Sequence, residues 1–130
     1  PQFIHPDYHF ISISHSSLYA SVYLHKSKNV GIDIESLGRK FSMIEKKYLS
    51  EKELEQAKVH PDLKAIYWSC KEAVFKWAGK DGVDFRKQIK IEKFDPERTN
   101  MIEAIFAGKI EQAVKLNFLI FDNHVLVYTQ

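Results

Sequence analysis

The stretch that decides the fold is WSCKEAVFKWAG, residues 68–79. Through this stretch and the turn before it, apolar side chains recur at the spacing of a helix that turns about 100° per residue. The members of this stripe are Leu63, Ile66, Tyr67, Cys70, Val74 and Trp77. Gly79 follows the stripe as a natural helix terminator. The pattern therefore predicts one long helix that begins near residue 62 and buries the stripe.

The same helix has a second apolar side. Trp68 and Phe75 fall opposite the buried stripe, and Glu72 lies between them. A helix that is apolar on two sides is covered on both, so we expect Glu72 in a cleft or interface. An unpaired charge there would be costly, and the carboxylate would need a cation or a proton. The alternative is an exposed helix with an i, i+4 ion pair between Glu72 and Lys76.

Strand patterns lie on both sides of the helix. Residues 10–14 alternate apolar and polar side chains and lead into a polar turn at residues 14–17, after which the alternation resumes over 18–24 as a hairpin. Ser50 and Glu53 have the spacing of a capping box, which predicts a short helix before the long one. The last third predicts strands over 88–94, 101–107, 115–121 and 124–128, with a turn at 122–123. This order predicts an α+β fold in which an antiparallel or mixed sheet packs against one long helix.

Length and composition exclude several classes of protein. A chain of 130 residues, of which 45% are hydrophobic, has the size of one compact domain, so we expect a single domain over residues 1–130. A net charge of +2 is too small to favour a nucleic-acid partner. Cys70 is the one cysteine and forms no internal disulfide, and no signal peptide or apolar run of about 20 residues is found. These features predict a cytoplasmic protein without a membrane partner.

The sequence VGIDIE at residues 30–35 predicts a third strand with its aliphatic side chains on one face. Asp33 and Glu35 then share the other face, about 7 Å apart along the strand. Gly31 on that face would admit another backbone or a ligand at close range. The alternative is a strand whose second face is solvated. Together with Glu72, the two acids would offer three oxygen donors, which suit Mg²⁺, with Mn²⁺ as the other candidate ion.

Three segments carry a resemblance to a known family. ISISHS at residues 11–16, VGIDIE at 30–35 and WSCKEAVFK at 68–76 resemble, in order and spacing, the signature segments of 4'-phosphopantetheinyl transferases, particularly of the surfactin-synthetase-activating (Sfp) type. The resemblance extends from about residue 10 to residue 82. It implies the half-domain fold of that family, which is distantly related to holo-acyl-carrier-protein synthases.

The resemblance also implies a reaction and a set of site residues. The reaction is transfer of the phosphopantetheine arm of coenzyme A to a serine of an apo acyl or peptidyl carrier protein, with release of 3',5'-ADP. Asp33, Glu35 and Glu72 would hold Mg²⁺, and Glu72 would also be the catalytic base, directly or through a water. The residues implied to contact coenzyme A are Ser14, His15, Lys71 and Lys76. From the residues alone, a histidine in a turn is equally a solvated side chain.

The expected partner is an acidic carrier protein of fatty-acid, polyketide or peptide synthesis. A basic surface for it is offered by Arg39, Lys40, Lys46 and Lys47, with an ordinary solvated face as the alternative. Proteins of the surfactin-activating type have two similar halves, and this chain matches the second. Either the other half lies in sequence not shown, or identical chains associate, which the aromatic side of the long helix favours. Competing functions are another metal-dependent phosphodiester enzyme and a non-catalytic carrier-binding domain.

Overall fold

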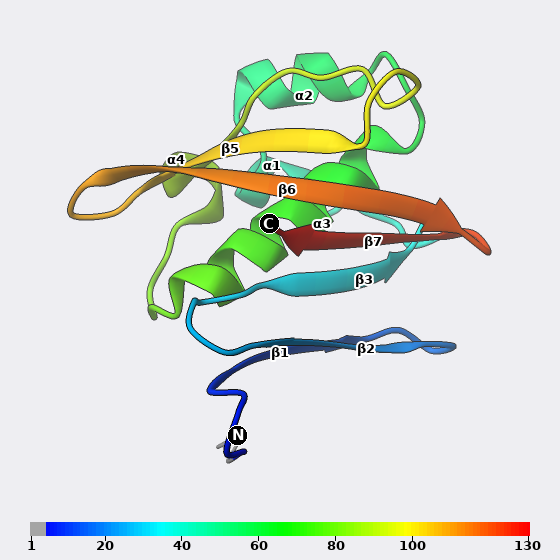
Figure 1. Cartoon of the computed structure of the whole chain (residues 1–130). Helices are drawn as coiled ribbons and strands as arrows, with labels where there is room; N and C mark the ends of the chain where they lie inside the picture. Colours follow the sequence, from blue (N-terminus) through cyan, green and yellow to red (C-terminus); the bar gives the residue numbers. More distant parts are fainter. Residues whose placement is uncertain (1–4) are drawn as a thin grey trace.

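A long helix and the sheet that covers it define the fold of the computed structural model, which describes residues 5–130 (Figure 1). Helix α3 (Leu63–Ala78) begins after Asp62 and ends where Gly79 adopts the left-handed backbone, with φ of 63°. Both predicted ends are thereby confirmed. Ile66, Cys70 and Val74 from the predicted stripe are fully buried in the core.

Five antiparallel strands form the main sheet in the order β3-β7-β6-β5-β4. Their bounds are β3 (Ile32–Ser36), β4 (Ile89–Ile91), β5 (Met101–Ala107), β6 (Glu111–Phe121) and β7 (His124–Thr129). Asp122 and Asn123 have φ of 46° and 55°, the left-handed pair that a two-residue hairpin turn requires. The α+β class with a sheet packed on one long helix is confirmed.

The prediction differs from the structure at two strands. The strand expected over 88–94 is only three residues long: helix α4 (Phe85–Gln88) includes its first residue, and residues 92–94 are not part of the strand. Asp84 caps that helix by accepting a hydrogen bond from the Lys87 amide at 3.0 Å. Strand β6 also begins four residues before the expected position, at Glu111.

Two short helices cover the amino-terminal part of α3. Helix α2 (Glu51–Ala57) begins with the predicted capping box, in which Ser50 and Glu53 each bond the other's backbone amide. Helix α1 (Glu45–Tyr48) was not expected from the sequence, and it places the buried Tyr48 ring edge-on against Trp68, with centroids 5.0 Å apart. Within residues 5–130, no helix has the length and apolar character to cross a membrane.

Strands β1 (Phe10–His15) and β2 (Ala20–His25) form a separate two-stranded hairpin beside β3 (Figure 1). In this hairpin polar side chains, not apolar ones, face the protein interior. Ser12 and Ser14 are buried, while Ile13 and Val22 are 46% and 57% exposed. The two serine hydroxyls accept hydrogen bonds from β3 amides at 3.0 Å each. They satisfy the edge of the sheet, which would otherwise carry unpaired buried N–H groups.

Candidate active site

The site is built where β3 and α3 come into contact. A Cβ atom added at Gly31 would lie 1.9 Å from the carbonyl oxygen of Ala73, so only glycine allows the two backbones to approach this closely. This confirms the close approach expected at Gly31. The contact places the acidic face of β3 beside the part of α3 that carries Glu72 and Lys76.

Asp33 is the most buried of the three predicted acids, with 3% of its surface exposed. Its Oδ1 accepts hydrogen bonds from the Ser14 hydroxyl at 3.1 Å and from the Lys76 ammonium at 3.4 Å. Its Oδ2 is buried and has no hydrogen-bond partner. Burial, reinforced by the charges of Glu35 and Glu72, raises the pKa of Asp33 to about 7, although Lys76 and Ser14 act in the opposite direction. The site therefore has more negative charge than its own cations compensate.

Glu35 is held by two side chains that sequence reasoning did not assign to the site. Its Oε1 accepts a hydrogen bond from the Trp68 indole N–H at 2.9 Å, and its Oε2 pairs with Arg39 at 3.0 Å. The Arg39 guanidinium lies over the rings of Trp68 and Phe41, 5.3 and 5.4 Å from their centroids. Trp68 therefore orients the Glu35 carboxylate in addition to packing against the Tyr48 ring. No rule of residue spacing indicates this hydrogen bond.

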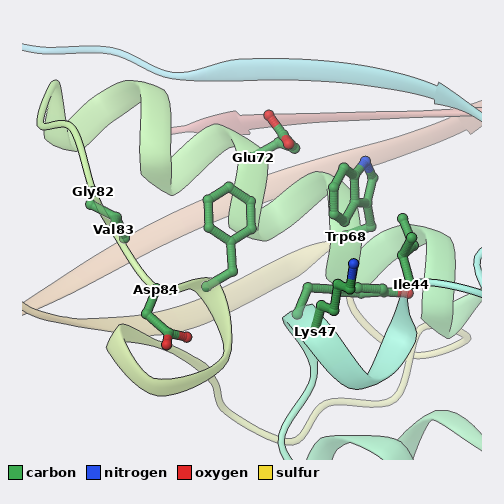
Figure 2. Close-up of a pocket in the computed structure, with 9 residues that line it drawn as sticks. Ile44, Lys47, Trp68, Glu72, Gly82, Val83 and Asp84 are labelled. Atoms are coloured by element: carbon green, nitrogen blue, oxygen red, sulfur yellow. The ribbon is translucent and has the colours of Figure 1, made fainter.

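Glu72 lies in a cleft, as its aromatic surroundings predicted. It lines a pocket of about 550 Å³ together with Trp68, Tyr48 and Phe85. Figure 2 shows Glu72 and Trp68 projecting from α3, with Ile44 and Lys47 of the α1 region next to Trp68. Burial raises the pKa of Glu72, the Lys76 charge lowers it, and the Glu35 charge raises it.

The three carboxylates influence one another electrostatically but are not arranged as a coordination sphere. Within the described residues 5–130, no three side chains of His, Cys, Asp and Glu are arranged as the ligand set of an ion. Glu35 and Glu72 nevertheless both raise the pKa of Asp33, so the three charges act on one region. The chemistry of the site fits a hard divalent cation, because its side chains are oxygen donors, its charge is negative and the Oδ2 atom of Asp33 has no hydrogen-bond partner.

The two predicted lysines have different places. Lys76 lies at the site, where its ammonium donates to Asp33 and to the carbonyl oxygens of Ile13 and Ile32 at 3.1 and 2.9 Å. Glu72 is therefore not its hydrogen-bonded i, i+4 partner. Lys71 is fully buried and pairs with Glu53 of α2 at 2.8 Å.

Lys71 also donates to the Phe85 carbonyl at 2.9 Å. The helix geometry directs it away from the acidic group, since neighbouring residues on a helix point about 100° apart. In this structure Lys71 contacts Glu53 and not the acidic group, which sequence spacing did not suggest. A contact of Lys71 with coenzyme A stays a prediction.

Ser14 and His15 stand at the end of β1 nearest the acids. The Ser14 hydroxyl donates to Asp33 and accepts from the Ile34 amide, so its contacts are inside the protein. His15 alternates to the other side of the strand and is exposed. The structure therefore leaves the His15 ring accessible to a ligand and assigns Ser14 to orienting Asp33.

The α+β domain thus has three neighbouring carboxylates, one of which, Glu72, lines an aromatic pocket. Residues 29–127 match the family model of the 4'-phosphopantetheinyl transferase superfamily, and the chain belongs to this superfamily. It is therefore related to transferases of phosphopantetheine. A search of curated proteins gives no match.

Among solved structures, the chain is similar to the crystal structure of Thermotoga maritima holo-[acyl-carrier-protein] synthase, with a TM-score of 0.58 and 16% sequence identity. The match covers 78% of this chain and 61% of that one, so this chain spans less than two thirds of its structural relative. At this identity the likeness establishes the shared fold.

Proposed function

We propose that the chain transfers the 4'-phosphopantetheine arm of coenzyme A to a serine hydroxyl of an apo carrier protein, in a reaction that depends on Mg²⁺. The observation that carries this proposal is that three carboxylates of β3 and α3 lie near one another, with Glu72 lining a pocket, in a chain of this superfamily. The serine oxygen forms a bond to the phosphorus next to the pantetheine arm. The bond from that phosphorus to 3',5'-ADP breaks, and the serine proton passes to a base.

Asp33, Glu35 and Glu72 would hold the ion. When bound, Mg²⁺ supplies positive charge to the pyrophosphate and to the leaving group. Glu72 is also our choice for the base, because its carboxylate lies in the pocket beside the proposed ion site and could take the serine proton directly or through a water. Lys76 keeps a positive charge beside Asp33 and supports the same phosphate-binding region.

The pocket beside Glu72 suits the uncharged arm of coenzyme A. Its walls include Ile44, Tyr48, Trp68 and Phe85, and amide and methyl groups pack well on such apolar and aromatic surfaces. We therefore place the pantetheine arm there, with the nucleotide end directed toward His15. A cytoplasmic location remains a prediction. The family's known use of coenzyme A agrees with it.

Self-association stays a prediction, but the surface that would support it differs from the one expected. The aromatic side of α3, expected to be open, is covered within the chain, since Trp68 and Phe75 both pack on Phe85. Exposed apolar side chains lie instead on the β1–β2 hairpin, at Ile13 and Val22 among others, and also at the end of β6, at Leu119, Ile120 and Phe121. Sedimentation velocity would determine whether the chain associates with itself or requires another half.

The proposal is tested by weighing an apo carrier protein after incubation with the chain, coenzyme A and Mg²⁺. A gain of one phosphopantetheine group per carrier supports transfer, and EDTA should abolish it. Carrier binding without a mass gain would favour a non-catalytic domain. Neither binding nor gain would favour the phosphodiester alternative.

Glu72→Gln should reduce the rate of transfer roughly 10²-fold or more, the usual contribution of a positioned base. Glu55→Gln is the matched control, because Glu55 is an exposed glutamate on α2 paired with Lys58. Full turnover by Glu72→Gln would exclude this residue as both base and essential metal ligand.

A further inference from the structure

The β1–β2 hairpin is attached to the rest of the protein by side chains. Within residues 5–130 its two strands pair only with each other, and β3 meets them through the hydroxyls of Ser12 and Ser14. Lys76 adds a third link by donating to the Ile13 carbonyl. Because few contacts hold this hairpin, the position of its tip depends on the contacts made there.

At the tip, Ser16 meets His124 of β7, and the distance from Ser16 Oγ to His124 Nε2 is 3.0 Å. His124 Nδ1 lies 2.7 Å from the carbonyl oxygen of Asp122, which can only accept a hydrogen bond. Nδ1 therefore carries the proton, and Nε2 accepts from the Ser16 hydroxyl. The same Ser16 oxygen accepts hydrogen bonds from the backbone amides of Leu18 and Tyr19 at 3.2 and 3.1 Å. The Ser16 hydroxyl is therefore both a donor and an acceptor.

Tyr19 strengthens the same junction, which joins the tip of the β1–β2 hairpin to the turn between β6 and β7. Its hydroxyl donates to Asp122 Oδ2 at 2.5 Å, and its ring lies edge-on to His124 and Phe121. His124 is 3% exposed, so it contacts no substrate itself. This burial and the number of partners indicate that the junction has one defined geometry.

His15 lies between the two anchored serines. Ser14 is fixed on Asp33 and the Ile34 amide, and Ser16 is fixed on His124. Alternation along the strand turns His15 the other way, into solvent. The backbone of His15 is thus held from both sides while its ring stays free.

We propose that His124 is a positioning residue that acts through Ser16 to hold His15 in place for the anionic 3'-phosphate end of coenzyme A. The inference rests on the proposed function. It assigns no contact with substrate to His124, and it explains why a buried histidine of β7 is joined to a turn more than a hundred residues away.

The test compares coenzyme A with 3'-dephospho-coenzyme A as substrates for carrier modification. His124→Asn, whose side chain is too short to reach Ser16, should reduce the preference for coenzyme A roughly fivefold, as the loss of one net hydrogen bond predicts. Ser16→Ala should give the same loss without altering the buried ring, which guards against a failure of His124→Asn to fold. His124→Gln should restore much of the preference, because its amide oxygen can accept from Ser16.

His15→Ala should remove the preference, and adding His124→Asn to it should cause no further loss. His9→Asn is the matched control, an exposed histidine near the other end of the hairpin. Two results would overturn the positioning role alone. In the first, the Michaelis constants for coenzyme A and 3'-dephospho-coenzyme A rise together in His124→Asn. In the second, the preference for coenzyme A is unchanged in both His124→Asn and Ser16→Ala. A wild-type chain without any preference would overturn the role of His15 and its positioning together, and a wild-type chain without transfer would overturn the proposed function as well.

Discussion

The residue on which the site depends most is Asp33. It lies between a sheet edge and a helix, accepts from Ser14 and Lys76 through one oxygen, and leaves the other oxygen buried without a partner. A buried acceptor with no donor is costly unless a ligand satisfies it. This partnerless oxygen supports the proposal that Asp33 holds a cation.

The first residue-scale prediction concerns pH in EDTA. Burial raises the pKa of Asp33 from 3.8 to about 7, so between these values the folded protein keeps a proton that the unfolded chain has lost. The free energy of unfolding should then fall as the pH rises through this window, by up to about 4 kcal/mol from this group. Denaturant unfolding at a series of pH values would measure the fall.

Asp33→Asn is the reference for that experiment, because it removes the titrating group and keeps the oxygen that Ser14 bonds. The difference in unfolding free energy between the two proteins should change across the window and level off on either side. A difference that is the same at every pH would show that Asp33 titrates normally.

The second residue-scale prediction separates the two lysines of α3. Lys71→Met should cost about 3–5 kcal/mol of stability, because it leaves the Glu53 carboxylate buried without its partner. Lys76→Met removes a charged donor from the site and should lower kcat/KM roughly tenfold or more. Thermal unfolding and steady-state transfer, measured on both variants, check the pair. A Lys71→Met protein that is as stable as wild type would contradict the buried ion pair.

At the scale of elements, the site depends on the contact between β3 and α3. Asp33 and Glu35 belong to the strand and Glu72 to the helix, so their separation is set by how closely the two backbones approach. Gly31 sets that approach. The glycine therefore affects both packing and the geometry of the carboxylates.

Gly31→Ala is predicted to be strongly destabilising. The new methyl group would overlap the Ala73 carbonyl at 1.9 Å, and backbone on both sides leaves little room to adjust, so we expect a loss of about 3 kcal/mol or more. Gly38→Ala is the matched control, since the nearest atoms to its added Cβ are side-chain atoms at 3.6 Å. Denaturant unfolding would compare the two, and equal effects would contradict the close backbone contact.

At the scale of the whole molecule, the pocket is assembled from several parts of the chain. Glu72 and Trp68 come from α3, Lys47 and Tyr48 from α1, and Phe85 from α4. Lys46 and Lys47 are exposed on α1, and Lys47 lines the pocket itself. This places a basic surface at the entrance, where an acidic carrier protein would dock.

Replacing Lys46 by glutamate should therefore raise the KM for the carrier protein and leave the KM for coenzyme A unchanged, because Lys46 does not line the pocket in which we place the pantetheine arm. Like charges at a docking surface repel an acidic partner, and added salt should reduce the difference from wild type. Lys109→Glu is the control, an exposed lysine in the loop between β5 and β6. Unchanged constants for both substrates would remove α1 from the docking surface.

The sequence by itself determined the long helix and its ends, the capping box at Ser50, and the acidic strand that carries Asp33 and Glu35. These features follow from local periodicity and from hydrogen bonds between neighbours in the chain, so a pattern of spacing is sufficient to predict them. The same periodicity correctly predicted a cleft around Glu72, because aromatic residues share its side of the helix.

Only the tertiary structure decided which partners these side chains find. Lys71 turns to Glu53 rather than to the site, Arg39 and Trp68 hold Glu35, and the hairpin buries its serines because the edge of β3 offers unpaired amides. Apart from the pair of Arg39 with Glu35, which are four residues apart, these contacts join residues far apart in the chain. Their energies arise from desolvation and from packing between elements, which no local spacing encodes.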